Sequence, residues 1–242
     1  MTLPLFLGCT LIAFGPTFAL FYRIVLQRPQ LTILAVASSF FWLLSLLLSS
    51  VVWVIIPPLQ KVTWLVIILS VLIQEAGRYF TVKLYFYCFE KVKAKLAGTR
   101  DILPLNDLSA AISGGVGTGA MYALTMYGQV GSYTLSEPGT VYTEMCPAVS
   151  LYLTTSLLCC FFSLLHVMLM ILAFDAYREG SQFGSAMIVS FHMGASLISL
   201  RSQHVVNGCL QSVFGELVLS VICGAYLVAV AKRRGGMDRF LR

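Results

Sequence analysis

Long runs of apolar residues, separated by short polar segments, dominate this sequence. A helix of about 20 apolar residues spans the roughly 30 Å hydrocarbon core of a bilayer. We predict seven such helices, at residues 3–26, 31–56, 62–83, 108–130, 150–174, 183–200 and 210–231, of which the sixth is the shortest. Because the connections are short, the pattern predicts an all-α, polytopic membrane protein: one seven-helix transmembrane bundle forming a single domain over residues 1–242.

The composition supports a membrane protein and excludes a soluble globule. Apolar residues make up 58% of the chain and charged residues 11%, with a mean hydropathy of +0.87. So few polar residues could not cover the surface of a soluble domain.

The basic residues predict the orientation of the bundle, because Lys and Arg accumulate in cytoplasmic loops. Every basic residue except Lys61 and Arg201 lies near the ends of predicted helices one, three, five and seven. This set comprises Arg23, Arg28, Arg78, Lys83, Lys91, Lys93, Lys95, Arg100, Arg178, Lys232, Arg233, Arg234, Arg239 and Arg242. The loop between helices four and five holds Glu137 and Glu144 without a basic residue. We therefore expect a lumenal or extracellular N-terminus and a cytosolic C-terminus.

Two further expectations follow from the charges. Because the basic residues are divided among several loops, they do not form the stripe that binds nucleic acid, and no nucleic-acid partner is expected. The first residues lack the basic start of a cleaved signal peptide, so the first helix should be retained as an anchor.

The fourth predicted helix carries small residues every four positions. Ala111, Gly115, Gly119 and Ala123 share one face of a helix, and Ser113 and Gly117 form a neighbouring row. Such rows let two helix backbones approach closely in lipid, where apolar burial does not drive association. Either a partner helix or a helix of the same bundle could pack against this face.

Ionisable residues within membrane spans are costly and usually indicate function. His166 and His192 lie on consecutive antiparallel helices, both roughly 12 to 14 Å from the cytosolic boundary at 1.5 Å per residue. They could bond to each other, receive a polar group of a partner in a shared cavity, or be satisfied separately in the core. Glu75 and Arg78, spaced i and i+3, form another candidate pair. Glu216 is placed at the lumenal interface.

The sequence offers no catalytic apparatus. No aspartate lies well inside a span, and neither a GxSG nor an HExxH motif is present. No Cys/His set has the spacing of a metal site, so we expect no metal, no cofactor and no catalytic residue. Cys146 and Cys209 fall in or near lumenal loops, where a disulfide could form.

Several segments resemble the anterior-pharynx-defective (Aph-1) subunit family of γ-secretase. The resemblance rests on residues 6–10 (FLGCT), 13–16 (AFGP), 18–21 (FALF), 40–43 (FFWL), 45–47 (SLL), 50–53 (SVVW), Gln74 and Glu75 with Arg78, the Ala/Gly row, residues 164–166 (LLH), 174–176 (FDA) and His192. It implies a seven-helix scaffold that binds nicastrin, then presenilin and the presenilin enhancer, within membrane lipid. It places the protein in the endoplasmic reticulum, Golgi, plasma membrane and endosomes.

The resemblance also implies roles for individual residues. The row at Gly115 and Gly119 would support assembly, and His166 and His192 would support assembly and activity. Ala111 stands where the family usually has the first glycine of the row. Presenilin would supply the catalytic aspartates, so this chain would be a non-catalytic subunit supporting proteolysis of type I membrane proteins such as Notch and amyloid precursor protein.

A second hypothesis is a seven-helix receptor or small-solute transporter. In that case Glu75, Arg78, His166 and His192 would line a binding cavity. The sequence lacks Asp-Arg-Tyr at the end of helix three and Asn-Pro-x-x-Tyr in helix seven. A transporter would more often show broken helices in repeated halves, and only Gly15-Pro16 suggests a break.

Overall fold

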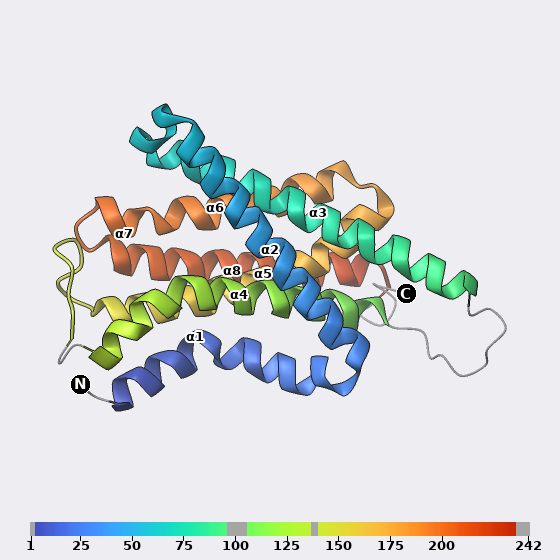
Figure 1. Ribbon diagram of the computed structural model, residues 1–242, viewed down its shortest axis with the longest axis horizontal. Helices are drawn as coiled ribbons and strands as arrows, with labels where there is room; N and C mark the ends of the chain where they lie inside the picture. Colours follow the sequence, from blue (N-terminus) through green and yellow to red (C-terminus); the bar gives the residue numbers. More distant parts are fainter. Residues whose placement is uncertain (1–2, 96–105, 137–139, 236–242) are drawn as a thin grey trace.

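The computed structural model describes residues 3–95, 106–136 and 140–235, without the side chains of 92–95 and 134–136. The charges of Lys93, Lys95, Arg100, Glu137, Arg239 and Arg242, used above to predict orientation, lie outside this description. The helices are α1 (Leu3–Arg23), α2 (Pro29–Ile55), α3 (Thr63–Lys95), α4 (Asp107–Ser136), α5 (Leu151–Glu179), α6 (Gln182–Ser199), α7 (Arg201–His204) and α8 (Gly208–Arg233). Short 3-10 turns, η1 (Val25–Gln27) and η2 (Pro57–Lys61), follow α1 and α2 (Figure 1).

The described residues are all-helical, as predicted, and contain no β-strand beyond one isolated bridge between Thr143 and Cys146. Six helices are long and apolar enough to cross a membrane: α1, α2, α3, α5, α6 and α8. Helix α4 is as long as these, but its many glycines and hydroxyl residues make it less apolar. The sequence predicts that the third helix ends at Lys83, where its apolar stretch stops. Helix α3 instead continues to Lys95, because a helix can extend beyond its apolar stretch.

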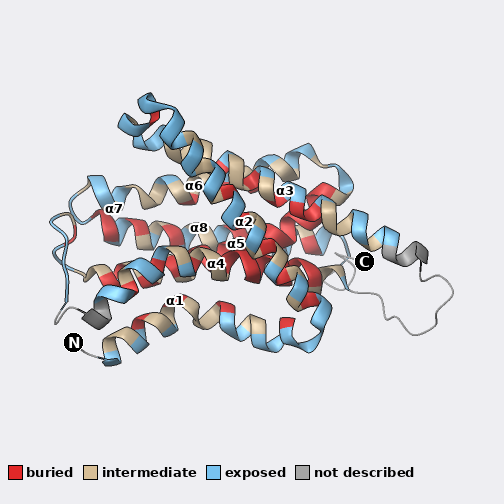
Figure 2. Ribbon diagram, viewed as in Figure 1, coloured by how far each residue is buried: buried red, intermediate tan, exposed pale blue. Residues whose placement is uncertain are grey.

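Helix α5 runs through the middle of the bundle and packs against α1, α3, α4, α6 and α8. Buried residues concentrate on α5 and on the facing side of α4, whereas the outer helices are mostly exposed (Figure 2). Helices α2 and α3 form a hairpin that crosses α4 on one side and approaches α6 on the other (Figure 1). The core therefore forms around one central helix.

Ionic contacts join several helices at the end of the bundle where α5 and α8 finish. Arg178 of α5 pairs with Asp107 at the start of α4, and Asp107 accepts a hydrogen bond from Tyr85 of α3. Arg234, after α8, lies 3.4 Å from Asp175 and 3.3 Å from Glu179. Burial opposes the charge on Arg234, but the two carboxylates outweigh that effect and raise its pKa. Opposite charges thus link α4, α5 and the end of α8, and the Tyr85 hydrogen bond adds α3.

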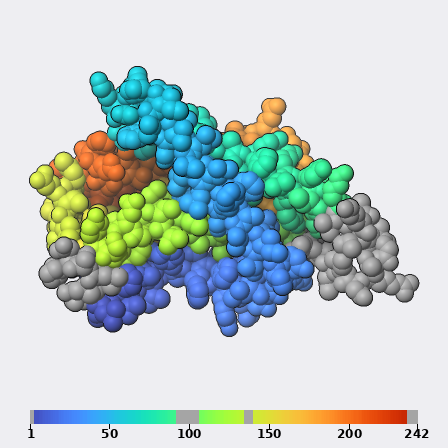
Figure 3. Space-filling view, viewed as in Figure 1, coloured from blue at the N-terminus to red at the C-terminus, as the bar shows by residue number. Residues whose placement is uncertain are grey.

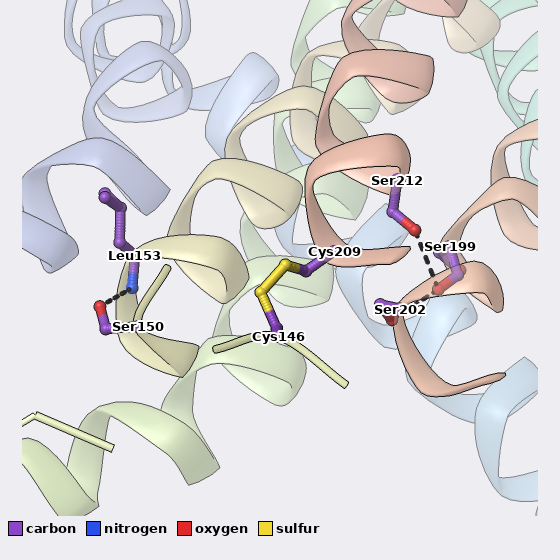
Figure 4. Close-up of a disulfide and its surroundings, with 7 residues drawn as sticks. All are labelled: Cys146, Ser150, Leu153, Ser199, Ser202, Cys209 and Ser212. Atoms are coloured by element: carbon purple, nitrogen blue, oxygen red, sulfur yellow. Dashed lines mark hydrogen bonds between the residues drawn. A yellow bond between two sulfur atoms is a disulfide. The ribbon is translucent and has the colours of Figure 1, made fainter. Parts of the chain in front are cut away.

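The opposite end of the bundle is closed by a disulfide between Cys146 and Cys209 (Figure 4). Their Cα atoms are 5.9 Å apart, within the usual range for a disulfide. The bond ties the segment before α5 to the start of α8, and Asn207 N donates to Met145 O alongside it at 2.8 Å. Ser150, the N-cap of α5, lies nearby, and its hydroxyl accepts a hydrogen bond from Leu153 N.

Candidate functional site

The small residues of α4 form two contact faces. On one, Gly115 and Gly119 lie against α5: a Cβ added to Gly115 would be 2.6 Å from Val167 Cα, and one added to Gly119 would be 2.7 Å from Ser163 O. Ser163 Oγ also donates to Gly119 O at 2.9 Å. Ala111 and Ala123 are fully buried on the same face. The predicted row is therefore occupied by a helix of the same chain, so it is not an open face for another subunit.

The neighbouring row of α4 faces α2. A Cβ on Gly117 would collide with the backbone of Ala35, and Ser39 Oγ donates to Gly117 O at 2.8 Å. Ser113 Oγ donates to the carbonyl of Leu31. These hydroxyls find backbone acceptors across the interface, as buried polar groups in lipid must. Helix α4 thus holds both α2 and α5 at close range.

The four ionisable residues identified from the sequence lie together in one hydrogen-bonded cluster. Arg78 Nε donates to Glu75 Oε1 and Oε2 at 3.2 and 3.0 Å. Glu75 Oε1 lies 2.5 Å from His192 Nδ1, and Arg78 Nη2 lies 3.1 Å from His166 Nδ1. The two imidazole rings are 5.1 Å apart, edge to face. We refer to Glu75, Arg78, His166 and His192 as the ionisable cluster.

The cluster links three helices, because Glu75 and Arg78 come from α3, His166 from α5 and His192 from α6. Each of the four side chains is at most 5% exposed. Arg78 Nη1 also donates to the carbonyl of His166 at 3.3 Å, so this arginine fixes both the ring and the backbone of α5. A buried charge is tolerated in an apolar interior when it is paired and hydrogen-bonded. The cluster can therefore hold α3, α5 and α6 together through buried hydrogen bonds and an ion pair.

The hydrogen bonds assign protons to the two imidazoles. A guanidinium only donates, so Nδ1 of His166 must accept and the proton of this neutral ring is on Nε2. A carboxylate accepts, so Nδ1 of His192 donates to Glu75. His166 Nε2 is buried and has no hydrogen-bond partner among the described residues.

Residues that the sequence analysis did not propose as site residues surround the cluster. Trp42 and Tyr122 place their rings 6.3 and 5.4 Å from that of His166, and Trp42 Nε1 donates to Gln74 Oε1 at 3.2 Å. Beside Arg78, polar residues including Ser38 and Gln74 enclose about 10 Å³ of water-accessible space. That volume is about the minimum for one water. Gln74 lies four residues before Arg78 and therefore on the same face of α3. This spacing was the signal in the sequence that could have placed Gln74 beside the cluster.

Glu216, which the sequence places at the lumenal interface, is buried by protein. It lies in α8, is 0% exposed, and neither carboxylate oxygen has a hydrogen-bond partner among the described residues. Gly215, its neighbour, contacts Ile198 of α6, which places this turn of α8 against the bundle. Counting residues from a helix end gives depth but does not say which face turns inward.

The ionisable cluster offers one carboxylate, one guanidinium and two imidazoles, all engaged with one another. The ionisable cluster holds no Ser, Cys or Asp nucleophile beside a base, which nucleophilic catalysis requires. Among residues 3–95, 106–136 and 140–235, no group of three His, Cys, Asp or Glu side chains could hold a metal ion. The hydrogen bonds of the cluster fix the positions of α3, α5 and α6 relative to one another.

Comparisons with known proteins give the chain a family. A family model described as Aph-1 protein matches residues 4–234. The chain is 36% identical to the human protein named gamma-secretase subunit APH-1B, covering 100% of this chain and 93% of the relative. It is 32% identical to Drosophila melanogaster gamma-secretase subunit Aph-1 (100% and 98% covered) and 29% identical to an Arabidopsis thaliana gamma-secretase subunit APH1-like protein (96% and 93%). With nearly its whole length matched by the model, the chain belongs to the Aph-1 family.

Proposed function

We propose that this chain is a non-catalytic scaffold subunit of γ-secretase. The observation that carries the proposal is the ionisable cluster, which joins α3, α5 and α6 and contains no reactive nucleophile. The names of the relatives, each a gamma-secretase subunit, support the same conclusion. The cluster's carboxylate and imidazoles are engaged with one another, and it has no pair of aspartates for aspartyl proteolysis. In this role the chain holds nicastrin, presenilin and the presenilin enhancer together in the membrane and supports cleavage of type I membrane proteins such as Notch and amyloid precursor protein.

The scaffold is a single domain over residues 1–242 with seven transmembrane helices. Helix α4 is the seventh span in addition to the six most apolar helices, because it lies between α2 and α5 inside the bundle. The N-terminus is lumenal or extracellular and the C-terminus cytosolic, which places the end rich in Arg and Lys in the cytosol. The assembled protein resides in the endoplasmic reticulum, Golgi, plasma membrane and endosomes.

The small-residue row of α4 supports assembly indirectly. Because α5 covers Gly115 and Gly119, the row sets the distance between α4 and α5 and thereby the position of His166 on α5. The outer faces of the bundle, rather than this row, meet the other subunits. Many large apolar side chains are exposed there, as expected for a surface covered by lipid and partner helices.

The geometry gives little support to a receptor or transporter. The four residues that would line a binding cavity are bonded to one another, and the space beside Arg78 is about 10 Å³. A small organic ligand needs a pocket of some 300 Å³ or more.

Co-purification tests the scaffold proposal. Tagged wild type is extracted in mild detergent, and the retained proteins are identified by mass spectrometry. The comparison variant is His166→Ala with His192→Ala, and the control is His204→Ala, since His204 is exposed on α7. We expect nicastrin and presenilin with wild type and with the control, and loss of presenilin from the double variant.

Two results would overturn the proposal. A stable wild-type protein that retains neither nicastrin nor presenilin would exclude the scaffold role. Undiminished presenilin with a correctly folded double variant would show that the cluster does not contribute to assembly. Size-exclusion profiles of the variants distinguish failure to assemble from failure to fold.

A further inference from the structure

A groove between α1, α2 and α4 is separate from the ionisable cluster. It encloses about 280 Å³, many times the roughly 30 Å³ of one water in the liquid. Its lining residues are Phe14, Thr17, Phe18, Phe21, Ala35, Val36, Ser39, Val116, Gly117 and Ala120. The three helices share one face of the molecule (Figure 3), and α1 and α2 are candidate membrane spans. The groove therefore lies between helices that we expect to cross the membrane.

The shape of the groove follows from its residues. Small residues, Ala35, Gly117 and Ala120, form part of its lining, where α2 and α4 approach so closely that a Cβ on Gly117 would collide with Ala35. Bulky Phe14 and Phe18 of α1 stand on the opposite side. Small side chains beside large ones leave a hollow that the bundle itself does not fill.

The wall of the groove is mostly hydrocarbon. Its two hydroxyl residues are engaged internally: Thr17 Oγ1 donates to Phe14 O at 3.0 Å, and Ser39 Oγ donates to Ala35 O and Gly117 O at 2.9 and 2.8 Å. Satisfied polar groups do not attract a polar ligand. An occupant must therefore be apolar over the length of the groove.

Two exposed basic residues lie at the α1–α2 turn, between the groove residues Phe21 and Ala35 in the chain. Arg28, at the N-cap of α2, is exposed and precedes the groove residues Ala35 and Ser39 by seven and eleven positions in the chain. At 1.5 Å per residue, Arg28 is roughly 10 Å along the helix from Ala35. Arg23, at the end of α1, adds a second exposed charge, whereas the acidic residues Asp107, Asp175 and Glu179 are paired elsewhere.

From these observations we propose that the groove is a phospholipid site, in which one acyl chain lies against α1, α2 and α4 and the lipid phosphate binds Arg28. A lipid in the adjacent leaflet has its phosphate at the membrane boundary and its chains directed inward, which matches a basic residue above an apolar groove. The guanidinium suits a phosphate because it offers several donors in one plane. This site does not depend on the proposed γ-secretase role.

Photolabelling tests the site. The full-length chain, with whichever subunits remain bound, is placed in phosphatidylcholine nanodiscs containing a phosphatidylglycerol probe with a diazirine in the middle of one acyl chain. Labelled peptides are mapped by mass spectrometry. We expect labelling concentrated on the lining residues of α1, α2 and α4, and competition by unlabelled phosphatidylglycerol.

Two pairs of variants examine the two halves of the site. Val36→Trp fills the groove, and Ile33→Trp is its control, because both residues are exposed on α2 but Ile33 does not line the groove. Arg28→Gln removes the phosphate ligand, and Lys61→Gln removes a charge at the other end of α2. We expect groove labelling to fall about fivefold in Val36→Trp and in Arg28→Gln, and to be unchanged in both controls.

Several outcomes would overturn the proposal. Labelling spread evenly over exposed apolar residues, including Ile33, would show only the general lipid surface. Groove labelling that is as strong in Arg28→Gln as in wild type would exclude the contact between Arg28 and the phosphate. An unlabelled wild-type groove, with the probe instead attached to a helix of another subunit, would show that a protein helix fills it.

Discussion

Helices α5 and α1 look alike in sequence but occupy different environments. In the most apolar stretch of α5, 67% of the residues are buried, whereas the corresponding value for α1 is 17%. Both stretches are apolar enough to cross a membrane, so hydropathy does not separate a helix surrounded by protein from one facing lipid. The difference lies in the polar and small residues that neighbouring helices direct at α5, including Arg78 and Gly119. Burial in this bundle is therefore determined by neighbours rather than by apolarity.

The strongest test removes a charge that fixes α5 to its surroundings. Glu75→Gln leaves Arg78 buried without its carboxylate, and we expect a loss of about 3–5 kcal/mol in the free energy of unfolding. Glu90→Gln on the same helix is the control, because Glu90 is exposed. Unfolding in mixed micelles, followed by helical circular dichroism, measures both variants.

A double variant sharpens this test. Glu75→Gln with Arg78→Gln removes both charges, so the loss should be smaller than for Glu75→Gln alone. Equal stability of Glu75→Gln and wild type would mean that the cluster does not hold α3 against α5 and α6. The cluster would then not explain why α5 is more buried than α1.

The second test separates α4 from α5. Gly119→Leu inserts a side chain where even a Cβ would lie 2.7 Å from Ser163 O, and we expect a loss of about 3 kcal/mol from overpacking. Gly128→Leu is the matched control, since no atom lies within 4 Å of a Cβ at that position. The same unfolding assay should show the control unchanged; a similar loss in both variants would point to a general effect of replacing glycine in α4.

The sequence was sufficient to predict an all-helical chain and to single out the small row of α4 and the histidines His166 and His192, because each depends on local periodicity or on an ionisable residue in an apolar run. It did not reveal that Glu75 and Arg78 bond to those histidines, since the rotation of α3 relative to α5 and α6 is set by tertiary packing. Nor could periodicity decide which helix covers Gly119.

Glu216 is a second case in which tertiary packing, rather than position in the sequence, determines the surroundings of a residue. Its position near the end of an apolar run suggests the interface, yet α8 turns this carboxyl inward, where no described residue bonds to it. Leaving a buried polar group unsatisfied costs about 1–3 kcal/mol. Glu216→Leu should therefore raise the free energy of unfolding by about 1 kcal/mol in the same assay. A lower stability would show that Glu216 has a partner in the native protein.

The smallest expected change in the free energy of unfolding is for a residue of α1, the more exposed of the two helices. Leu11 of α1 is 70% exposed, so Leu11→Ala removes atoms that contact lipid in both the folded and the partly unfolded protein. We expect a change within about 0.5 kcal/mol. Leu169→Ala on α5 makes the identical chemical change at a 0% exposed position and should cost about 2–5 kcal/mol, because the neighbouring helices cannot fully close the cavity. If unfolding measurements gave equal losses for the two leucines, α1 would be covered by protein, and its exposed face would be a subunit interface rather than a surface for lipid.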